Sequence, residues 1–195
     1  MKKSMKLRHP FEWLSKTAQK RAFVVLLVLA VVVMVSLQVF GSPLKTRVAP
    51  FGIVSFEFAG EQSQAKAIVE SWGARAQVYA GLNLGLDYLF LVAYAGSIGL
   101  GCVLVAQSLA KRAAILYSAG VFLAWGQIVA ALLDSVENYA LIRILLGSVQ
   151  EQWSMVALWC AAPKFMIVAL GLVYFLVGGV VVLVARIRWR NGHAA

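Results

Sequence analysis

The sequence predicts an all-α protein, a four-helix transmembrane bundle with a short N-terminal interfacial helix and one outward-facing capping loop. Of its 195 residues, 62% are hydrophobic and 13% are charged, whereas soluble domains hold about 45–50% and about 25%. Its mean hydropathy is +0.82, and it contains apolar runs long enough to cross a hydrocarbon core of roughly 30 Å as helices. These observations exclude a soluble domain, a disordered chain and a nucleic-acid binder, although the net charge is +10.

Four apolar segments predict the spans, at about residues 22–40, 78–109, 113–141 and 157–185, within a single integral membrane domain over residues 1–195. Because lipid offers no hydrogen bonds to the backbone and the segments lack strand-like alternation, we expect each of them to be a helix. The first span carries no charge, and its apolar run exceeds the roughly 7–15 residues typical of a signal peptide. We therefore expect this segment to be retained as a helix.

Basic residues concentrate on one side of these spans. Twelve of the eighteen precede the first span, lie between the second and third, or follow the fourth. By the positive-inside rule, both termini are expected to be cytoplasmic, and the same charge favours contact with anionic membrane lipids. The twelve residues are Lys2, Lys3, Lys6, Arg8, Lys16, Lys20, Arg21, Lys111, Arg112, Arg186, Arg188 and Arg190.

The segment before the first span predicts a short helix lying in the membrane interface. Pro10 suits the first turn of a helix, and helical spacing would place Phe11, Leu14 and Ala18 on one apolar face. An amphipathic segment of this kind next to basic residues is typical of interfacial helices. We therefore expect it to anchor the start of the chain.

The loop over about residues 41–77 is the sizeable extramembrane segment, and it is too small for an independent domain. Alternation of Val54, Phe56 and Phe58 with polar neighbours predicts a short extended piece lying on the membrane. Residues 61–72 show helical periodicity, and Gly73 is positioned to end that helix. The loop is expected to cap the outer end of the bundle.

Charged residues from three spans are predicted to meet at one depth. At a rise of about 1.5 Å per residue, Asp87, Asp134 and Lys164 each lie about 32–35 Å from the cytoplasmic end of their helix. This is the outer boundary of the hydrocarbon. Because ionisable groups within spans rarely face lipid, a polar funnel opening outward is expected there.

Helical spacing adds polar neighbours to these three charges, and Glu57 in the loop is positioned to close the top. The alternative is that the charged residues mark the water boundary or form ion pairs, with Lys164 or Arg143, that only stabilise the bundle. The candidate ligand-binding residues are Asn83, Asp87, Gln127, Asp134, Glu137, Asn138 and Lys164.

No metal or cofactor is expected at this site. The two histidines, His9 and His193, lie near the termini and on the cytoplasmic side, which leaves the spans without the ligands preferred by transition metals. Cys102 and Cys160 are predicted at opposite faces of the membrane, too far apart for a disulfide.

The funnel predicts a protein that binds or transports a small polar, cationic or amphiphilic ligand. Transport would favour a homo-oligomer, and small residues spaced by four (Ala93, Ser97 and Gly101) allow close helix contacts. One alternative is a membrane-embedded enzyme acting on a lipid or isoprenoid, with unidentified catalytic residues. The other is a structural or assembly subunit of a membrane complex.

Two stretches carry a resemblance, Gly85-Leu86-Asp87-Tyr88-Leu89-Phe90 and Asp134-Ser135-Val136-Glu137-Asn138. They resemble small four-helix integral membrane proteins of bacteria to which no activity is assigned. The resemblance covers most of the chain and implies a location in the bacterial cytoplasmic (inner) membrane. In layout alone the chain is also similar to the EXPERA-type domain of sterol isomerases, but its spans lack the histidine that this chemistry would use.

Overall fold

A computed structural model describes residues 7–110, 113–148 and 150–192 of the chain. These residues are almost entirely helical and contain no strand. Four of the helices, α1, α3, α4 and α5, are long and apolar enough to cross a membrane, which agrees with the four predicted spans. The elements are α1 (Lys16–Gly41), η1 (Ser42–Leu44), α2 (Ile53–Glu57), α3 (Gln62–Leu109), α4 (Ala114–Leu145) and α5 (Gln152–Gly192).

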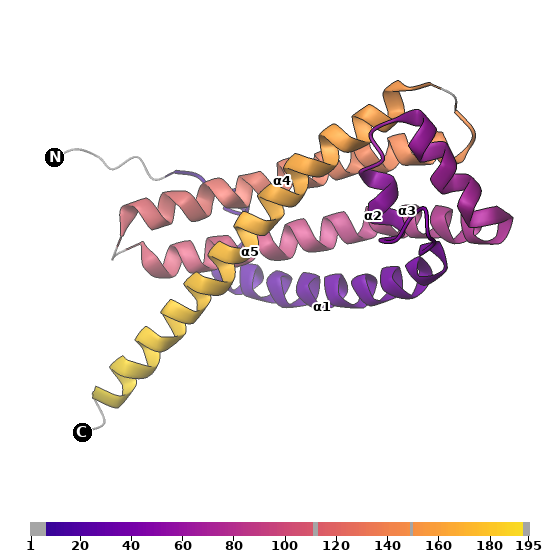
Figure 1. Ribbon diagram of the computed structural model, residues 1–195. Coiled ribbons are helices and arrows are strands. Elements are labelled where there is room, and N and C mark those ends of the chain that lie inside the picture. Colours follow the sequence, from indigo (N-terminus) through magenta and orange to yellow (C-terminus); the bar gives the residue numbers. More distant parts are fainter. Residues whose placement is uncertain (1–6, 111–112, 149, 193–195) are drawn as a thin grey trace.

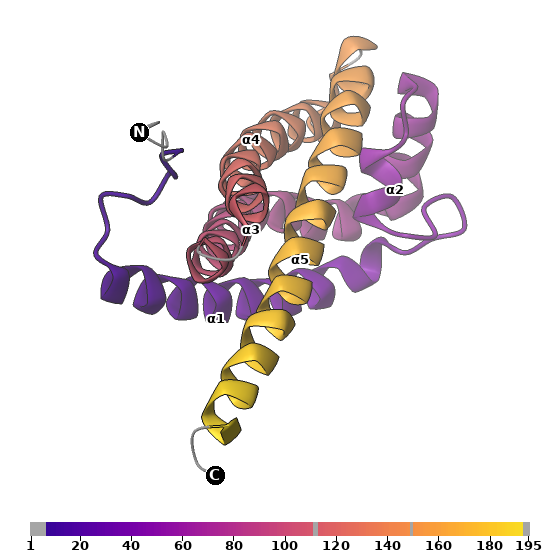
Figure 2. The same ribbon diagram turned by 90° about the vertical axis from the view of Figure 1, so that its left-hand side faces the viewer.

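Helix α3 is the centre of the bundle, because it packs against α1, α4 and α5. In the most apolar stretch of α3, 72% of the residues are buried, against 11% in that of α1 and 6% in that of α5. Helix α5 is steeply tilted relative to the other three and extends beyond them (Figures 1 and 2). We call the end that carries α2 and the α4–α5 connection the loop end. The opposite end, where α3 passes to α4, is the terminal end (Figure 1).

The predicted interfacial helix at the N-terminus is not present. Residues 10–13 form a turn instead, and α1 begins separately, with the Ser15 hydroxyl accepting a hydrogen bond from the backbone N–H of Ala18 at 3.2 Å. The Gln19 side chain donates to the backbone oxygens of Phe11 and Leu14 at 3.1 and 3.0 Å. Gln19 thus satisfies carbonyls that a continuous helix would have bonded along its own backbone, and it holds the segment as a turn.

The loop between α1 and the rest of the bundle contains one confirmed and one incorrect prediction. Gly73 interrupts α3 with φ 62° and ψ 172°, so the predicted helix before it is confirmed as a separate first segment. The predicted extended piece is wrong, because residues 53–57 form α2, a single helical turn. Gly52, at φ 62°, starts this turn, and the Ser55 hydroxyl accepts a hydrogen bond from the N–H of Phe51 at 3.0 Å. These local bonds stabilise a turn where alternation alone suggested a strand.

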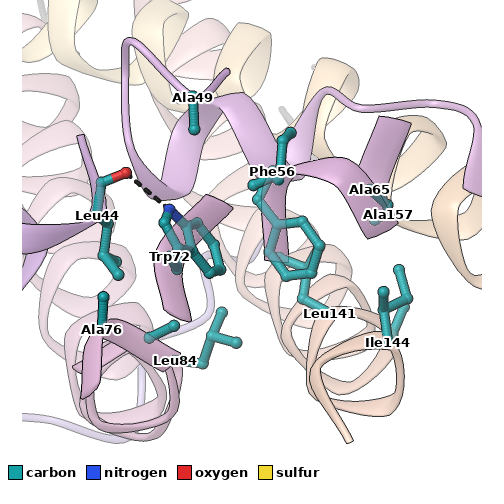
Figure 3. Packing of buried hydrophobic residues seen from close by; sticks show 13 residues of the cluster. Leu44, Ala49, Phe56, Ala65, Trp72, Ala76, Leu84, Leu141, Ile144 and Ala157 are labelled. Carbon is teal, nitrogen blue, oxygen red and sulfur yellow. Dashed lines mark hydrogen bonds between the residues drawn. The ribbon is translucent and has the colours of Figure 1, made fainter. Parts of the chain in front are cut away.

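A small hydrophobic core fixes this loop over the loop end of the bundle (Figure 3). The ring of Phe56 is 1% exposed and packs edge-on against Trp72, with ring centroids 5.3 Å apart. The Trp72 indole N–H donates to the backbone oxygen of Leu44 at 2.7 Å, and Leu141 of α4 and Ala157 of α5 complete the packing. The loop therefore caps the bundle as predicted, and this packing positions Glu57, the residue after Phe56, at the loop end.

Both cysteines are buried and free, as the predicted separation requires. Several residues used in the sequence argument lie outside the described part of the chain, namely Lys2, Lys3, Lys6, Lys111, Arg112 and His193.

Candidate functional site

A buried lysine of α5 is the centre of a charged cluster at the loop end. The Lys164 side chain is 7% exposed, and its Nζ lies 2.7 Å from Asp134 Oδ1 and 2.8 Å from Glu137 Oε2, both on α4. The same Nζ lies 4.0 Å from Glu57 Oε2 on α2. Two elements that are distant in sequence, α2 and α4, therefore contribute carboxyl groups to one ammonium group of α5.

Helix α3 joins this cluster through two hydrogen bonds. The Tyr94 hydroxyl donates to Asp134 Oδ2 at 2.9 Å, and the Asn138 amide donates to Asp87 Oδ2 at 2.6 Å. The expectation that charges of three spans lie at one level agrees with this arrangement. We call the following set the loop-end cluster: Glu57, Asp87, Tyr94, Asp134, Glu137, Asn138 and Lys164.

Two predicted site residues lie outside the loop-end cluster. The Asn83 amide donates to the backbone oxygen of Leu37 at 2.9 Å, which links α3 to α1. The Gln127 amide donates to the backbone oxygen of Ile167 at 3.1 Å, which links α4 to α5. Both side chains are buried and join neighbouring helices. The sequence placed them in the cluster because helical spacing predicts which residues share a face, but not which neighbouring helix that face meets.

Next to the loop-end cluster lies an elongated cavity of about 370 Å³, bounded by α1 and α5 and floored by α3. We call it the α1–α5 groove. Its charged lining consists of Glu57, Asp87, Asp134 and Lys164. The rest is mostly apolar: α1 contributes Leu27, Ala30, Val31 and Met34, and α5 contributes Phe165, Val168 and Leu172. One side of the cavity is therefore a hydrocarbon surface and one end is charged.

The groove is partly exposed along the side of the bundle. Val31 and Met34 of α1 and Phe165 of α5, which line it, are 43–47% exposed. Toward the terminal end α1 and α5 cross (Figure 2), and there Phe23 packs edge-on against Phe175, with ring centroids 5.5 Å apart. This aromatic contact joins α1 to α5 beyond the lining residues of the groove.

The loop-end cluster contains more acid than base. With every group ionised, its four carboxylates and one ammonium carry a formal charge of −3. Burial raises the pKa of Glu57 to about 7, an effect opposed by Lys164 and reinforced by Asp87 and Asp134. Within the described residues, Glu57 Oε2 and Glu137 Oε1 are buried without a hydrogen-bond partner. Ionised carboxylates only accept hydrogen bonds, so the cluster is short of donors when every group is ionised.

The terminal end holds a second polar group, which is neutral. Gln19 is 3% exposed, and its side-chain oxygen accepts from the Gln107 amide at 3.1 Å. Gln107 also lies 3.3 Å from His9 Nε2, and His9 Nδ1 accepts from the N–H of Phe11 at 3.2 Å. Burial lowers the pKa of His9, an effect that Glu12 opposes only in part. We call Gln19, Gln107 and His9 the terminal-end network, in which an uncharged imidazole is favoured.

Sequence reasoning missed two features of the site. Tyr94 carried a signal, because it lies seven residues after Asp87 and so returns to the same helical face, yet it was not among the candidate ligands. The apolar wall on α1 had no signal in the sequence, because that helix is apolar on every side. Its sequence therefore does not distinguish the face toward α5. Which face lines the groove depends on the tilt of α5.

Comparison of the chain with models of protein families, with curated proteins and with solved structures finds no match.

Within the described residues, no group of three or more His, Cys, Asp or Glu side chains is placed to hold a metal ion. The site is a charged end joined to an apolar groove.

Proposed function

We propose that this chain is an integral protein of a bacterial cytoplasmic membrane that binds an amphiphilic molecule in the α1–α5 groove. In this arrangement both termini are cytoplasmic and the loop end faces outward, as the distribution of basic residues favours. The four long apolar helices support insertion in a bilayer. The loop-end cluster then lies near the boundary between hydrocarbon and water.

The observation that carries this proposal is the polarity of the groove along its length. Glu57, Asp87, Asp134 and Lys164 lie at one end, whereas the walls contributed by α1 and α5 are apolar. An amphiphile has the same division, and ligand cavities commonly combine apolar walls with a few polar groups that orient the ligand. A lateral opening suits a ligand that arrives within the bilayer, with its chain between α1 and α5 and its head group at the cluster.

Binding is favoured over transport by the aromatic contact that joins α1 to α5 beyond the groove. Phe23 and Phe175 pack together between the lining residues and the terminal end, which favours a single lateral entrance over a path through one chain. Passage across the membrane would require α1 and α5 to separate, or a second copy of the chain to complete a path.

The proposal is tested with two neighbouring valines of α1. Val31 lines the groove, whereas Val32 is 56% exposed on the helix surface and is not part of the lining. Val31→Trp should fill the groove and lower retention of a 12-carbon amphiphile about tenfold or more, while Val32→Trp should leave retention unchanged. Native mass spectrometry of protein incubated with dodecylamine counts the bound molecules. Equal retention by both variants would contradict the proposal and favour a structural or assembly subunit.

A second candidate function is a membrane-embedded enzyme acting on a lipid or isoprenoid. It is favoured by the chain of contacts from Tyr94 through Asp134 to Lys164, which borders the groove and contains groups able to donate and accept protons. Conversion of a labelled lipid that depends on Asp134 would support this candidate over simple binding, and recovery of intact lipid would count against it.

A further inference from the structure

The strongest further observation is that Lys164 cannot balance the carboxyl groups around it. Its ammonium lies within 2.8 Å of oxygens of Asp134 and Glu137, but 4.0 Å from Glu57. Asp87 makes its hydrogen bond to a neutral amide, that of Asn138. Among the described residues, two carboxyl groups facing the groove therefore lack a cation at hydrogen-bond distance: Glu57 lies 4.0 Å from Lys164, and Asp87 has no ion pair.

One of these two groups, Glu57, also lacks a hydrogen-bond donor. The Glu57 side chain is 11% exposed, it lines the groove, and within the described residues its Oε2 has no hydrogen-bond partner. A buried polar atom without a partner costs free energy, so such atoms are retained when something else satisfies them. A ligand that supplies both N–H donors and positive charge would correct both deficits together.

Resting on the proposed function, we propose that the head group bound in the α1–α5 groove is a protonated primary amine carried on a single apolar chain. Glu57 and Asp87 accept its N–H hydrogen bonds, and Lys164 remains paired with Asp134 and Glu137. The cavity volume of about 370 Å³ is at the small end of the range for ligand sites, roughly 300–1,000 Å³, which suits one chain rather than a two-chain lipid. The ammonium lies at the loop end and the chain extends toward Phe23 and Phe175.

The test compares probes that share a 12-carbon chain and differ in the head group. Dodecylamine has charge and N–H donors, dodecyltrimethylammonium has charge alone, 1-dodecanol is neutral, and dodecanoate is negative. Binding is measured with the full chain in phosphatidylcholine nanodiscs, after subtraction of binding to empty nanodiscs. Because a hydrogen bond to a charged group is among the stronger single contacts, dodecylamine should bind about tenfold or more tightly than 1-dodecanol. Dodecyltrimethylammonium should bind less tightly than dodecylamine.

Variants assign this preference to the groove. Glu57→Gln and Asp87→Asn, each checked for a monodisperse elution profile, should lower dodecylamine affinity about tenfold and leave 1-dodecanol affinity unchanged. The matched control is Glu70→Gln, which removes an exposed acid of the loop region, paired with Lys66 at 3.8 Å. It should change neither affinity, which separates a contact in the groove from attraction by the surface as a whole.

The outcomes distinguish the two proposals. Equal binding of dodecylamine and 1-dodecanol, both abolished by Val31→Trp, would overturn the amine and leave the groove as a binding site. Tighter binding of dodecanoate, or an amine preference that persists in both Glu57→Gln and Asp87→Asn, would also overturn the amine assignment. Absence of saturable binding for every probe would overturn the proposed function itself, and the amine with it.

Discussion

The two ends of the bundle bury polar groups in opposite ways. At the terminal end, Gln19 donates to two backbone oxygens and accepts from Gln107, so a neutral network ties the first described residues to the helices. At the loop end, three carboxyl groups lie within 4.0 Å of Lys164, and buried oxygens of Glu57 and Glu137 have no hydrogen-bond partner among the described residues. The polar groups of the terminal-end network therefore have hydrogen-bond partners, whereas some of those in the loop-end cluster do not.

We propose that this difference reflects a role in folding at one end and a role in binding at the other. A fully paired neutral network stabilises the fold and needs nothing further. An over-acidic cluster is costly to bury, and such costs recur where a protein keeps groups for binding or catalysis. The contrast therefore supports the loop end as the functional end, and substitutions at the two ends should differ in size and in pH dependence.

The largest effect is expected for Lys164→Met. Removing the ammonium leaves Asp134 and Glu137 buried without their cation, which should lower the free energy of unfolding by about 3–5 kcal/mol. Thermal unfolding of the purified protein in detergent measures this loss. The matched control is Lys66→Met, which affects an exposed ion pair with Glu70 and should change stability by about 0.5 kcal/mol or less.

Neutralising the two acids that pair with Lys164 should reverse that loss of stability. In the triple variant Lys164→Met, Asp134→Asn and Glu137→Gln, the two positions in direct contact with residue 164 no longer carry unpaired buried charges, so much of the lost stability should return. If Lys164→Met melts like wild type, the ion pairs contribute little, and the loop end resembles an ordinary water boundary rather than a strained site.

These residues also show how far sequence reasoning reached. The four spans and the common level of Asp87, Asp134 and Lys164 followed from apolar length and from the rise of a helix. The break at Gly73 followed from helical periodicity up to residue 72 and from the preference for glycine at the end of a helix. The position of Glu57 was harder to predict, because α2 depends on a turn at Gly52 and on Phe56 packing against Trp72, a residue of another element. The N-terminal turn depends on Gln19, whose hydrogen bonds to Phe11 and Leu14 have no periodic signature.

An intermediate effect, with a defined pH window, is expected at Glu57. Its pKa is raised from an ordinary value of 4.5 to about 7, so the fold favours the protonated carboxyl. The contribution of this group to stability is complete below pH 4.5 and is lost as the pH rises through about 7. Between these limits, wild type should lose on the order of 2–3 kcal/mol relative to Glu57→Gln, which does not titrate.

Melting curves of wild type and Glu57→Gln at pH 4.5, 6.0 and 7.5 measure the difference. Glu70→Gln, a change at an exposed acid of the loop region, serves as the matched control and should follow wild type across the range. A wild-type curve that runs parallel to that of Glu57→Gln would mean that Glu57 is solvated or paired as well as any surface acid, and the contrast between the two ends would weaken.

The smallest effect is expected at the terminal end, for Gln19→Ala. This change leaves the backbone oxygens of Phe11 and Leu14 without their side-chain donor and removes the acceptor of the Gln107 amide, which should cost about 1–3 kcal/mol. Amide hydrogen exchange should accelerate over residues 7–15. The loop end should be unaffected, because within the described part of the chain no hydrogen bond or ion pair joins the terminal-end network to the loop-end cluster. Gln38→Ala, a change at an exposed position of the same helix, should alter neither quantity. Faster exchange that spreads to α2 would show that the two ends are one cooperative unit, and their different polar chemistry could then no longer be assigned to separate roles.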